Sequence, residues 1–195
     1  MVTVRSETFG DAWFAVAEND GGSLLSSSFS LARRREAVEA VVKSLPTRLR
    51  NEVKDEEGGS STLRMMYKLY SGETLKERPS LDMRFISPFR KNVYRVTGRI
   101  PRGFVSTYGI IAAKVGSRFA QRAVGNAMRS NPFTLFIPCH RVVPSTMNVG
   151  RYSLSSHPDS NSIIKRGILI REGVEFNGNE VSRKSVWSYK LRVKT

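Results

Sequence analysis

Cysteine and histidine are scarce in this chain of 195 residues, which contains one cysteine and two histidines. A single cysteine excludes an internal disulfide and a zinc site built from several cysteines, and it leaves the thiol free for chemistry in a reducing compartment. Long apolar runs are also missing, and the first residues contain no apolar signal core. We therefore expect a soluble, cytoplasmic protein with neither a membrane span nor a targeting signal.

Acidic residues are scarce in the second half of the chain but not in the first half. Residues 1–86 carry 13 basic and 13 acidic side chains, whereas residues 87–195 carry 19 basic and 4 acidic ones. The second half therefore holds the whole net charge of +15. A field of one sign favours a polyanion as partner, because each neutralised phosphate releases condensed counterions. An arginine-rich surface that only serves solubility is the alternative.

The first half is predicted to form a small α+β unit. A hairpin is indicated by two alternating stretches on either side of the turn at residues 19–22. The helix that follows has apolar residues at helical spacing and ends before Pro46. The expected elements are the hairpin Asp11–Ser30, the helix Ala32–Leu45, an acidic glycine-rich loop at Lys54–Ser60, a helix at Leu63–Tyr70 and a strand at Leu81–Ile86.

Ser87 and Pro88 are typical of a helix start, with a cap donor followed by proline at the first helical position. The charge composition changes at the same place. We therefore predict a first domain over residues 1–86, a second over residues 87–173 and a basic tail over residues 174–195. The tail is expected to form either a short hairpin or a disordered arm.

The second half is predicted to contain a helix-turn-helix. Two short helices joined at a Gly-Ser turn within the basic half favour this DNA-binding motif, although many small helical proteins show similar spacing. The predicted elements are the helices Pro88–Thr97, Thr107–Val115, Arg118–Ser130 and Ile163–Arg171, a buried strand at Phe133–Pro138, a strand or ordered loop at Val149–Leu154, and a polar loop at Ser155–Asn161.

The only cysteine lies in the segment IPCHRVV, directly before a histidine. A thiol attacks as thiolate, and His140 is a candidate base for Cys139. Adjacent residues of a strand point to opposite faces, so His140 meets the sulfur only if the chain turns or a water bridges them. Glu172 is the best-placed acid to orient His140. A buried structural cysteine is the alternative.

Four segments together resemble the O6-alkylguanine-DNA alkyltransferases, which move the alkyl group of damaged guanine onto their own cysteine. They read RAVGNAMRSNP (residues 122–132), IPCHRVV (137–143), NVGRYS (148–153) and IREG (170–173). The resemblance implies an α+β protein with a ribonuclease-H-like first domain and a winged helix-turn-helix second domain. The first domain matches only in its size and its pattern of a hairpin and a helix.

The resemblance implies a role for each site residue. Cys139 becomes the alkyl acceptor, His140 deprotonates it through a water, and Glu172 orients His140. Asn131 bridges the two halves of the site, or caps the preceding helix, and Tyr108 donates a proton or hydrogen bond to the leaving guanine. The remaining substrate contacts are the backbone carbonyls of Cys139 and Val142, the N–H of Ser153, and Met128 and Tyr152. No cofactor or metal is implied, and the first domain contains neither Cys nor His.

The resemblance also implies duplex DNA with an alkylated guanine as partner, bound through its minor groove by a monomeric, nucleoid-associated protein. Arg122 corresponds to the finger that fills the stack when the guanine is flipped out. Small residues on the same helix allow close approach to the groove. The DNA-contacting set is Arg122, Ala120, Gln121, Ala123, Gly125 and Arg129, with Gln121 standing where alanine is common.

Two other functions remain open from the residues themselves. One is a winged-helix regulator whose cysteine is structural or senses alkylation. The other is a cysteine hydrolase that uses Cys139, His140 and an acid, which requires turnover and has no need of such a positive charge.

Leu154 stands where many family members have glycine. The second histidine, His157, is interpreted as a surface loop residue.

Overall fold

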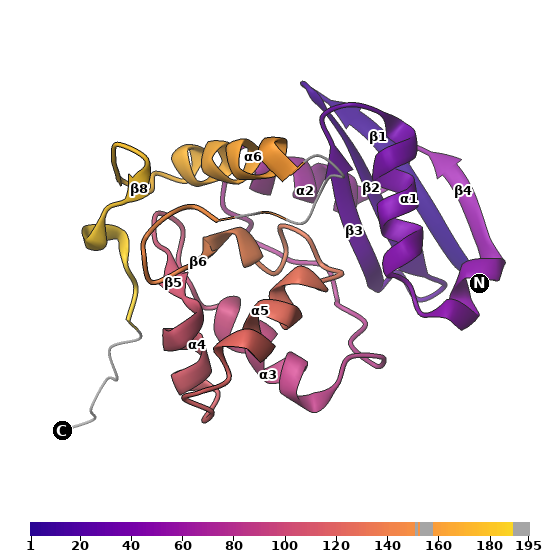
Figure 1. Ribbon diagram of the computed structural model, residues 1–195. Helices are drawn as coiled ribbons and strands as arrows, with labels where there is room; N and C mark the ends of the chain where they lie inside the picture. Colours follow the sequence, from indigo (N-terminus) through magenta and orange to yellow (C-terminus); the bar gives the residue numbers. More distant parts are fainter. Residues whose placement is uncertain (151, 153–157, 189–195) are drawn as a thin grey trace.

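The computed structural model describes residues 1–150, 152 and 158–188, and it has a mixed α+β fold (Figure 1). The first half contains β1 (Val2–Phe9), β2 (Ala12–Asn19), β3 (Leu24–Ser30), α1 (Arg34–Ser44), the 3-10 helix η1 (Thr47–Glu52), β4 (Val53–Glu57) and α2 (Ser61–Tyr70). The sheet has the order β3-β2-β1-β4, with β4 parallel to β1 and the other pairs antiparallel. The predicted hairpin and both predicted helices of this half are confirmed.

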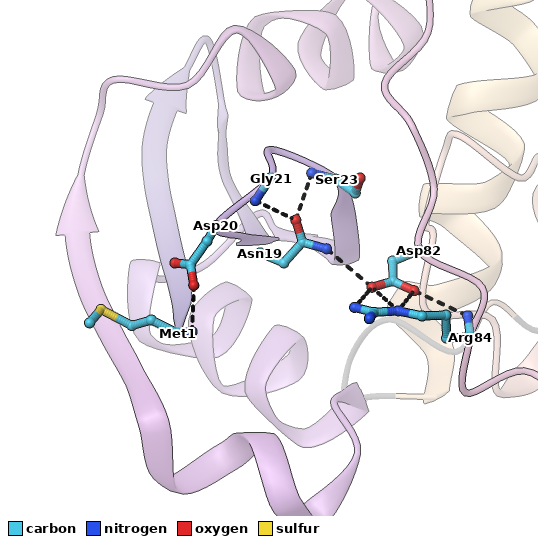
Figure 2. Close-up of polar contacts among 7 residues, drawn as sticks. All are labelled: Met1, Asn19, Asp20, Gly21, Ser23, Asp82 and Arg84. Carbon is cyan, nitrogen blue, oxygen red and sulfur yellow. Dashed lines mark hydrogen bonds and ion pairs between the residues drawn. The ribbon is translucent and has the colours of Figure 1, made fainter.

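Asn19 shapes the turn between β2 and β3 and connects it to a later segment (Figure 2). Its side-chain oxygen accepts hydrogen bonds from the backbone N–H groups of Gly21 and Ser23, both at 3.0 Å. Its amide nitrogen donates to Asp82 Oδ2 at 3.1 Å, and Asp82 also forms an ion pair with Arg84 at 2.6 Å. The segment that joins the two halves of the chain is therefore fastened to the hairpin.

Three expectations for the first half are wrong or incomplete. The acidic segment at Lys54–Ser60 is largely a strand, because β4 pairs with β1 and its carboxylates form ion pairs with Arg5 and Arg34. The strand expected at Leu81–Ile86 is absent; Leu81 forms only an isolated bridge, and Asp82 and Arg84 pair through side chains instead. Strand β1 lies where no element was predicted.

The sheet is buried on both faces. Helix α1 covers one face, where Val4, Ala17 and Val41 belong to one apolar cluster. The other face, with Phe14 and Phe29, packs against α2 and the helical second half in a larger cluster that also contains residues of α3, α4 and α5. One continuous core therefore connects the sheet to the part of the chain that carries the cysteine.

The second half contains α3 (Pro88–Thr97), β5 (Ser106–Thr107), α4 (Tyr108–Lys114), α5 (Gln121–Arg129), the 3-10 helix η2 (Cys139–Arg141), β6 (Val142–Val143), α6 (Pro158–Arg171), β7 (Phe176–Asn177), β8 (Glu180–Val181) and the 3-10 helix η3 (Arg183–Ser185). Strands β5 and β6 form a short parallel pair, and β7 and β8 form a short hairpin. Of the two alternatives for the tail, the hairpin is confirmed for the described residues.

Helices α3 and α4 begin much as their sequences predict. Ser87 Oγ accepts a hydrogen bond from the N–H of Arg90, and Thr107 Oγ1 accepts one from Ile110 at the start of α4. Helix α4 ends at a turn in which Gly116 has a φ of 83°, a conformation that glycine adopts without steric cost. Helix α5 begins at Gln121 rather than Arg118, because residues 117–120 form a turn.

The apolar segment Phe133–Pro138 is not a strand, which corrects the prediction. Its only ladder contacts are isolated bridges, Leu135 has a φ of 69°, and Pro138 leads directly into η2. The segment is apolar because it is buried in the core between the sheet and the helices. Helix α6 begins at Pro158, so residues 158–161 of the polar loop expected at Ser155–Asn161 are helical, and residues 155–157 lie outside the described part of the chain. Among the described residues, no helix has the length and apolar character needed to cross a membrane.

Candidate active site

Cys139 is the first residue of η2, at the end of a compact loop. The N–H of Ile137 donates to Phe133 O at 2.8 Å, that of Cys139 to Ile137 O at 2.7 Å, and that of Arg141 to Pro138 O at 2.9 Å. These successive turns remove the geometric restriction of an extended strand. Cys139 is half-buried, whereas the next residue, His140, is 1% exposed.

Asn131 holds this loop from its other end. Its amide nitrogen donates to Ile137 O at 3.1 Å and to Cys139 Sγ at 3.3 Å, and its side-chain oxygen accepts from the N–H of Phe133 at 3.0 Å. Ser130, rather than Asn131, occupies the C-cap position of α5. The Asn131 side chain thus connects the end of α5 to the cysteine, as the predicted bridging position requires.

His140, Arg141 and Glu172 form a buried charged cluster behind Cys139. His140 Nε2 lies 3.0 Å from Glu172 Oε1. Arg141 donates to both oxygens of Glu172, at 2.7 and 2.8 Å, and its remaining terminal nitrogen donates to Ile100 O at 2.7 Å. The carboxylate is therefore held in one orientation by two partners, and it holds the imidazole in turn.

The protonation states follow from these contacts. Burial opposes ionisation of Glu172, but His140 and Arg141 outweigh it and lower the pKa of the carboxyl to about 2. Burial lowers the pKa of His140, although Glu172 opposes this shift. The imidazole is thus neutral near pH 7. With Nε2–H donating to Glu172, the buried Nδ1, which has no hydrogen-bond partner among the described residues, is left as the basic nitrogen.

Cys139 rests as a thiol rather than a thiolate. Burial raises the pKa of the thiol, while the hydrogen bond from Asn131 and the nearby charge of Lys165 oppose the shift. Lys165 is 1% exposed, donates to Val142 O at 2.7 Å, and has a pKa lowered by burial to about 8. Formation of the nucleophile therefore requires that the proton be removed, and a cation already stands close to the resulting charge.

A cavity of about 410 Å³ opens over the cysteine. Its lining comes from α4, α5, the cysteine loop, the segment after β6 and α6: Tyr108, Arg122, Gly125, Asn126, Met128, Arg129, Cys139, Pro144, Gly150, Tyr152 and Lys165. Burial raises the pKa of Tyr108 and raises that of Tyr152 well above its ordinary value, so both phenols keep their protons. The cavity combines a nucleophile, phenolic donors and cations around one space.

The cavity brings together many of the residues predicted from the sequence. Tyr108, Met128 and Tyr152 line it with Cys139, and Arg122, Gly125 and Arg129 line it from α5. Gln121 and Ala123 are exposed on α5, and Ala120 is half-buried just before it. The Val142 carbonyl accepts from Lys165, and the Cys139 carbonyl accepts from the N–H of Val142. Ser153, Leu154 and His157 lie outside the described residues.

Known proteins with similar sequences place this chain in a family. The methylated-DNA–protein-cysteine methyltransferase of Thermococcus sibiricus is 32% identical over 181 residues, which cover 90% of this chain and 98% of that protein. This chain belongs to the methylated-DNA–protein-cysteine methyltransferase family. Residues 88–174 match the family model described as 6-O-methylguanine DNA methyltransferase, DNA binding domain.

Other members of the methyltransferase family agree with this assignment. The protein of the same name from Archaeoglobus fulgidus is 34% identical over 115 residues, which are 59% of this chain and 76% of that one. The crystal structure of O6-methylguanine-DNA methyltransferase from Pyrococcus kodakaraensis superposes with a TM-score of 0.66 at 28% identity, covering 89% of this chain and 100% of that chain. The mixed α+β fold is thus the fold of this family.

Arg141 and Lys165 are charged residues of the methyltransferase site that were not singled out from the sequence. Arg141 lies inside the IPCHRVV motif, but only the structure shows that it holds Glu172. Lys165 had a detectable signal: it precedes Glu172 by seven residues on a predicted helix and shares a face with Ile168 and Leu169, both fully buried. A lysine on the apolar face of a helix indicates a buried charge with a specific partner.

Proposed function

We propose that this protein repairs DNA by moving the alkyl group of an O6-alkylated guanine onto its own Cys139. The observation that carries the proposal is the position of the chain's only cysteine in a cavity, with a neutral imidazole held by a carboxylate behind it. Because the thioether formed at Sγ is stable, each molecule reacts once. O4-alkylthymine presents a similar alkyl ether and is proposed as a second substrate.

The reaction begins with loss of the thiol proton. His140 Nδ1 takes this proton through a bridging water, and Glu172 stabilises the resulting imidazolium. The sulfur then attacks the alkyl carbon, forming an S–C bond as the C–O6 bond breaks. The departing guanine accepts a proton from Tyr108 and leaves as neutral guanine, and Tyr108 recovers a proton through solvent from the His140 imidazolium, so the net change moves the thiol proton to guanine. Lys165 stabilises the thiolate while it exists.

Binding of the guanine is assigned to the remaining lining of the cavity. Met128 and Tyr152 contact the base, and the carbonyls of Cys139 and Val142 accept from its amino group, whereas the contact expected from Ser153 lies outside the described residues. A carbonyl oxygen has two lone pairs, so the existing hydrogen bonds of Cys139 and Val142 do not prevent this. Asn131, which follows α5, holds the Cys139 side chain in position during the reaction through its hydrogen bond to Sγ.

The partner proposed for the second half is duplex DNA. A guanine inside a duplex cannot reach Cys139, so it must be flipped into the cavity while Arg122 fills the vacated stack. Helix α5 then lies in the minor groove with Ala120, Gln121, Ala123, Gly125 and Arg129. In this proposal residues 1–86 form a ribonuclease-H-like domain, residues 87–173 a winged helix-turn-helix domain and residues 174–195 a basic tail, in a monomer.

The test compares wild-type protein with Cys139→Ala on a duplex whose O6-methylguanine carries a radioactive methyl group. We expect label to pass to the wild-type protein and not to the variant, while both bind the duplex. Label on the Cys139→Ala variant would contradict the assignment of the acceptor. Cavity position and family membership favour transfer over the regulator and hydrolase alternatives, for which no structural feature gives separate support.

A further inference from the structure

Phe119 is an aromatic residue without a packing partner in the fold. Its side chain is 95% exposed, the highest fraction among the large hydrophobic residues that the structure describes. It lies in the turn between α4 and α5, which Figure 1 shows at the edge of the molecule, away from the four-stranded sheet and from α6. An exposed phenyl ring adds no buried surface to the fold, so the residues around it, rather than its exposure, indicate what it binds.

The backbone beneath Phe119 is well held. The N–H of Ala120 donates to Ser117 O at 2.9 Å, and the Gln121 side chain donates to Arg118 O at 2.8 Å. These bonds close the turn on both sides of Phe119. The ring is therefore presented to solvent from an ordered turn, which lowers the entropic cost of binding through it.

The residues around Phe119 are suited to binding a polyanion. Arg118 precedes it and Arg122 follows it by three residues, and both are exposed. Aromatic side chains among arginines are typical of nucleic-acid surfaces, where the cations contact phosphates and the ring contacts bases or sugars. Arg122 also lines the cavity over Cys139, so DNA that delivers a base to the cysteine passes beside this turn.

Phe119 stands directly before the start of the helix that carries Arg122. The N–H of Val124 donates to Ala120 O, so the helical hydrogen-bond pattern already includes Ala120, the residue after Phe119. Successive bases of a strand are about 3.4 Å apart. A ring three residues before Arg122 is therefore placed to contact the base step beside the one that Arg122 occupies.

We propose that Phe119 is a second, apolar wedge that enters the minor groove beside Arg122 and contacts the neighbouring base step when the guanine is extruded. Minor-groove proteins commonly insert apolar side chains between base steps and kink the duplex. Arg122 fills the vacated position, whereas Phe119 weakens the adjacent stacking. This inference rests on the proposed repair function and adds to it a residue for duplex recognition.

The experiment measures single-turnover methyl transfer by the full chain to two substrates, duplex DNA and free O6-methylguanine base. Phe119→Ala is expected to slow transfer from the duplex about tenfold and to leave transfer from the free base unchanged. Phe119→Leu keeps an apolar wedge and is expected to restore most of the duplex rate. Phe104→Ala is the matched control, because Phe104 is 38% exposed but lies before β5, at the opposite end of α4.

A fluorescent adenine analogue placed beside the damaged guanine gives a second readout. Unstacking of this analogue on binding is expected with wild-type protein and is expected to be lost with Phe119→Ala. Equal slowing of both substrates, or no slowing of either, would overturn the wedge. So would a variant that keeps the duplex rate and loses instead self-association or binding to anionic vesicles, because Phe119 would then serve a second copy or a lipid surface.

The two proposals fail in different ways. If wild-type protein transfers no methyl group from either substrate, the repair function is wrong and the wedge is wrong with it. If wild-type protein transfers the group and Phe119→Ala matches it on the duplex, only the wedge is wrong.

Discussion

Glu172 shows how a single side chain sets the chemistry of the site. It accepts from Arg141 at both oxygens and pairs with His140, so it stays ionised although it is 3% exposed. An ionised Glu172 keeps the proton of His140 on Nε2 and leaves Nδ1 as the base. Loss of the carboxylate would remove this orientation and leave the Arg141 guanidinium buried without its partner.

The low pKa of Glu172 predicts an acid-labile contribution to stability. Its folded-state pKa of about 2 lies below the ordinary value of 4.5, so the contribution is complete above pH 4.5 and is lost as the pH falls towards 2. It amounts to about 3 kcal/mol at most. Denaturant unfolding measured from pH 6 to 2 should show a shallower loss of stability in Glu172→Gln than in wild type.

The control for this prediction is Glu175→Gln, which changes an exposed carboxylate nearby. An identical pH dependence in all three proteins would contradict the assignment.

Helix α5 shows how one element serves both the cavity and the proposed partner. Its buried residues, Val124, Ala127 and Met128, join the core, while Arg122 and Arg129 reach the cavity from the exposed side. Arg90 and Tyr94 of α3 hydrogen-bond to the carbonyls at the end of α5, next to Asn131. The helix is therefore held at the end that positions the cysteine loop.

Arg122→Ala should separate base flipping from chemistry. We expect it to slow transfer from duplex DNA by roughly one to two orders of magnitude, because extrusion of a base costs a few kcal/mol. Transfer from free O6-methylguanine base should change little. In contrast, His140→Ala should slow both substrates together, because it removes the base that forms the thiolate. If Arg122→Ala impaired both substrates equally, Arg122 would act in binding the guanine or in the fold rather than in flipping.

The elements that were predicted correctly have local signals. Ser87, Thr107 and Gly116 mark helix ends, and the turn around Asn19 marks the hairpin. The errors occur where tertiary contacts decide. The apolar run before Cys139 looks like a strand but is a buried loop. The acidic segment of β4 looks like a loop but pairs with β1 through its backbone, while Arg5 of β1 and Arg34 of α1 neutralise its carboxylates. The roles of the site residues follow from the resemblance of their motifs, whereas the role of Arg141 needed the structure, because its contact with Glu172 joins residues far apart in the sequence.

At the scale of the whole molecule, one core joins two parts of very different charge. The apolar cluster on the face of the sheet that α1 does not cover continues into α3, α4 and α5. Cations of the sheet are paired with carboxylates, as Arg5 is with Glu18 and Glu56. The excess of positive charge lies in residues 87–195. We therefore expect the sheet to support the site and the second half to bind DNA.

The charge distribution predicts a steep salt dependence of DNA binding. Contacts with 6–10 phosphates would lower affinity about 10³- to 10⁵-fold between 50 and 200 mM salt. Arg118→Gln, next to α5, should reduce the slope of log affinity against log salt by about one. Arg34→Gln should leave this slope unchanged, because Arg34 is already paired with Asp55 in the sheet. A slope that responds to Arg34 and not to Arg118 would place the bound DNA on the first half of the chain, residues 1–86.

The most direct test of the account is the intact mass of the full chain after incubation with excess duplex containing O6-methylguanine. The account predicts a gain of one methyl group per protein molecule, located on Cys139 by peptide mapping. It also predicts that repair stops when every molecule has gained that group. An unchanged protein mass while guanine is repaired, or repair of many guanines by each molecule, would contradict it.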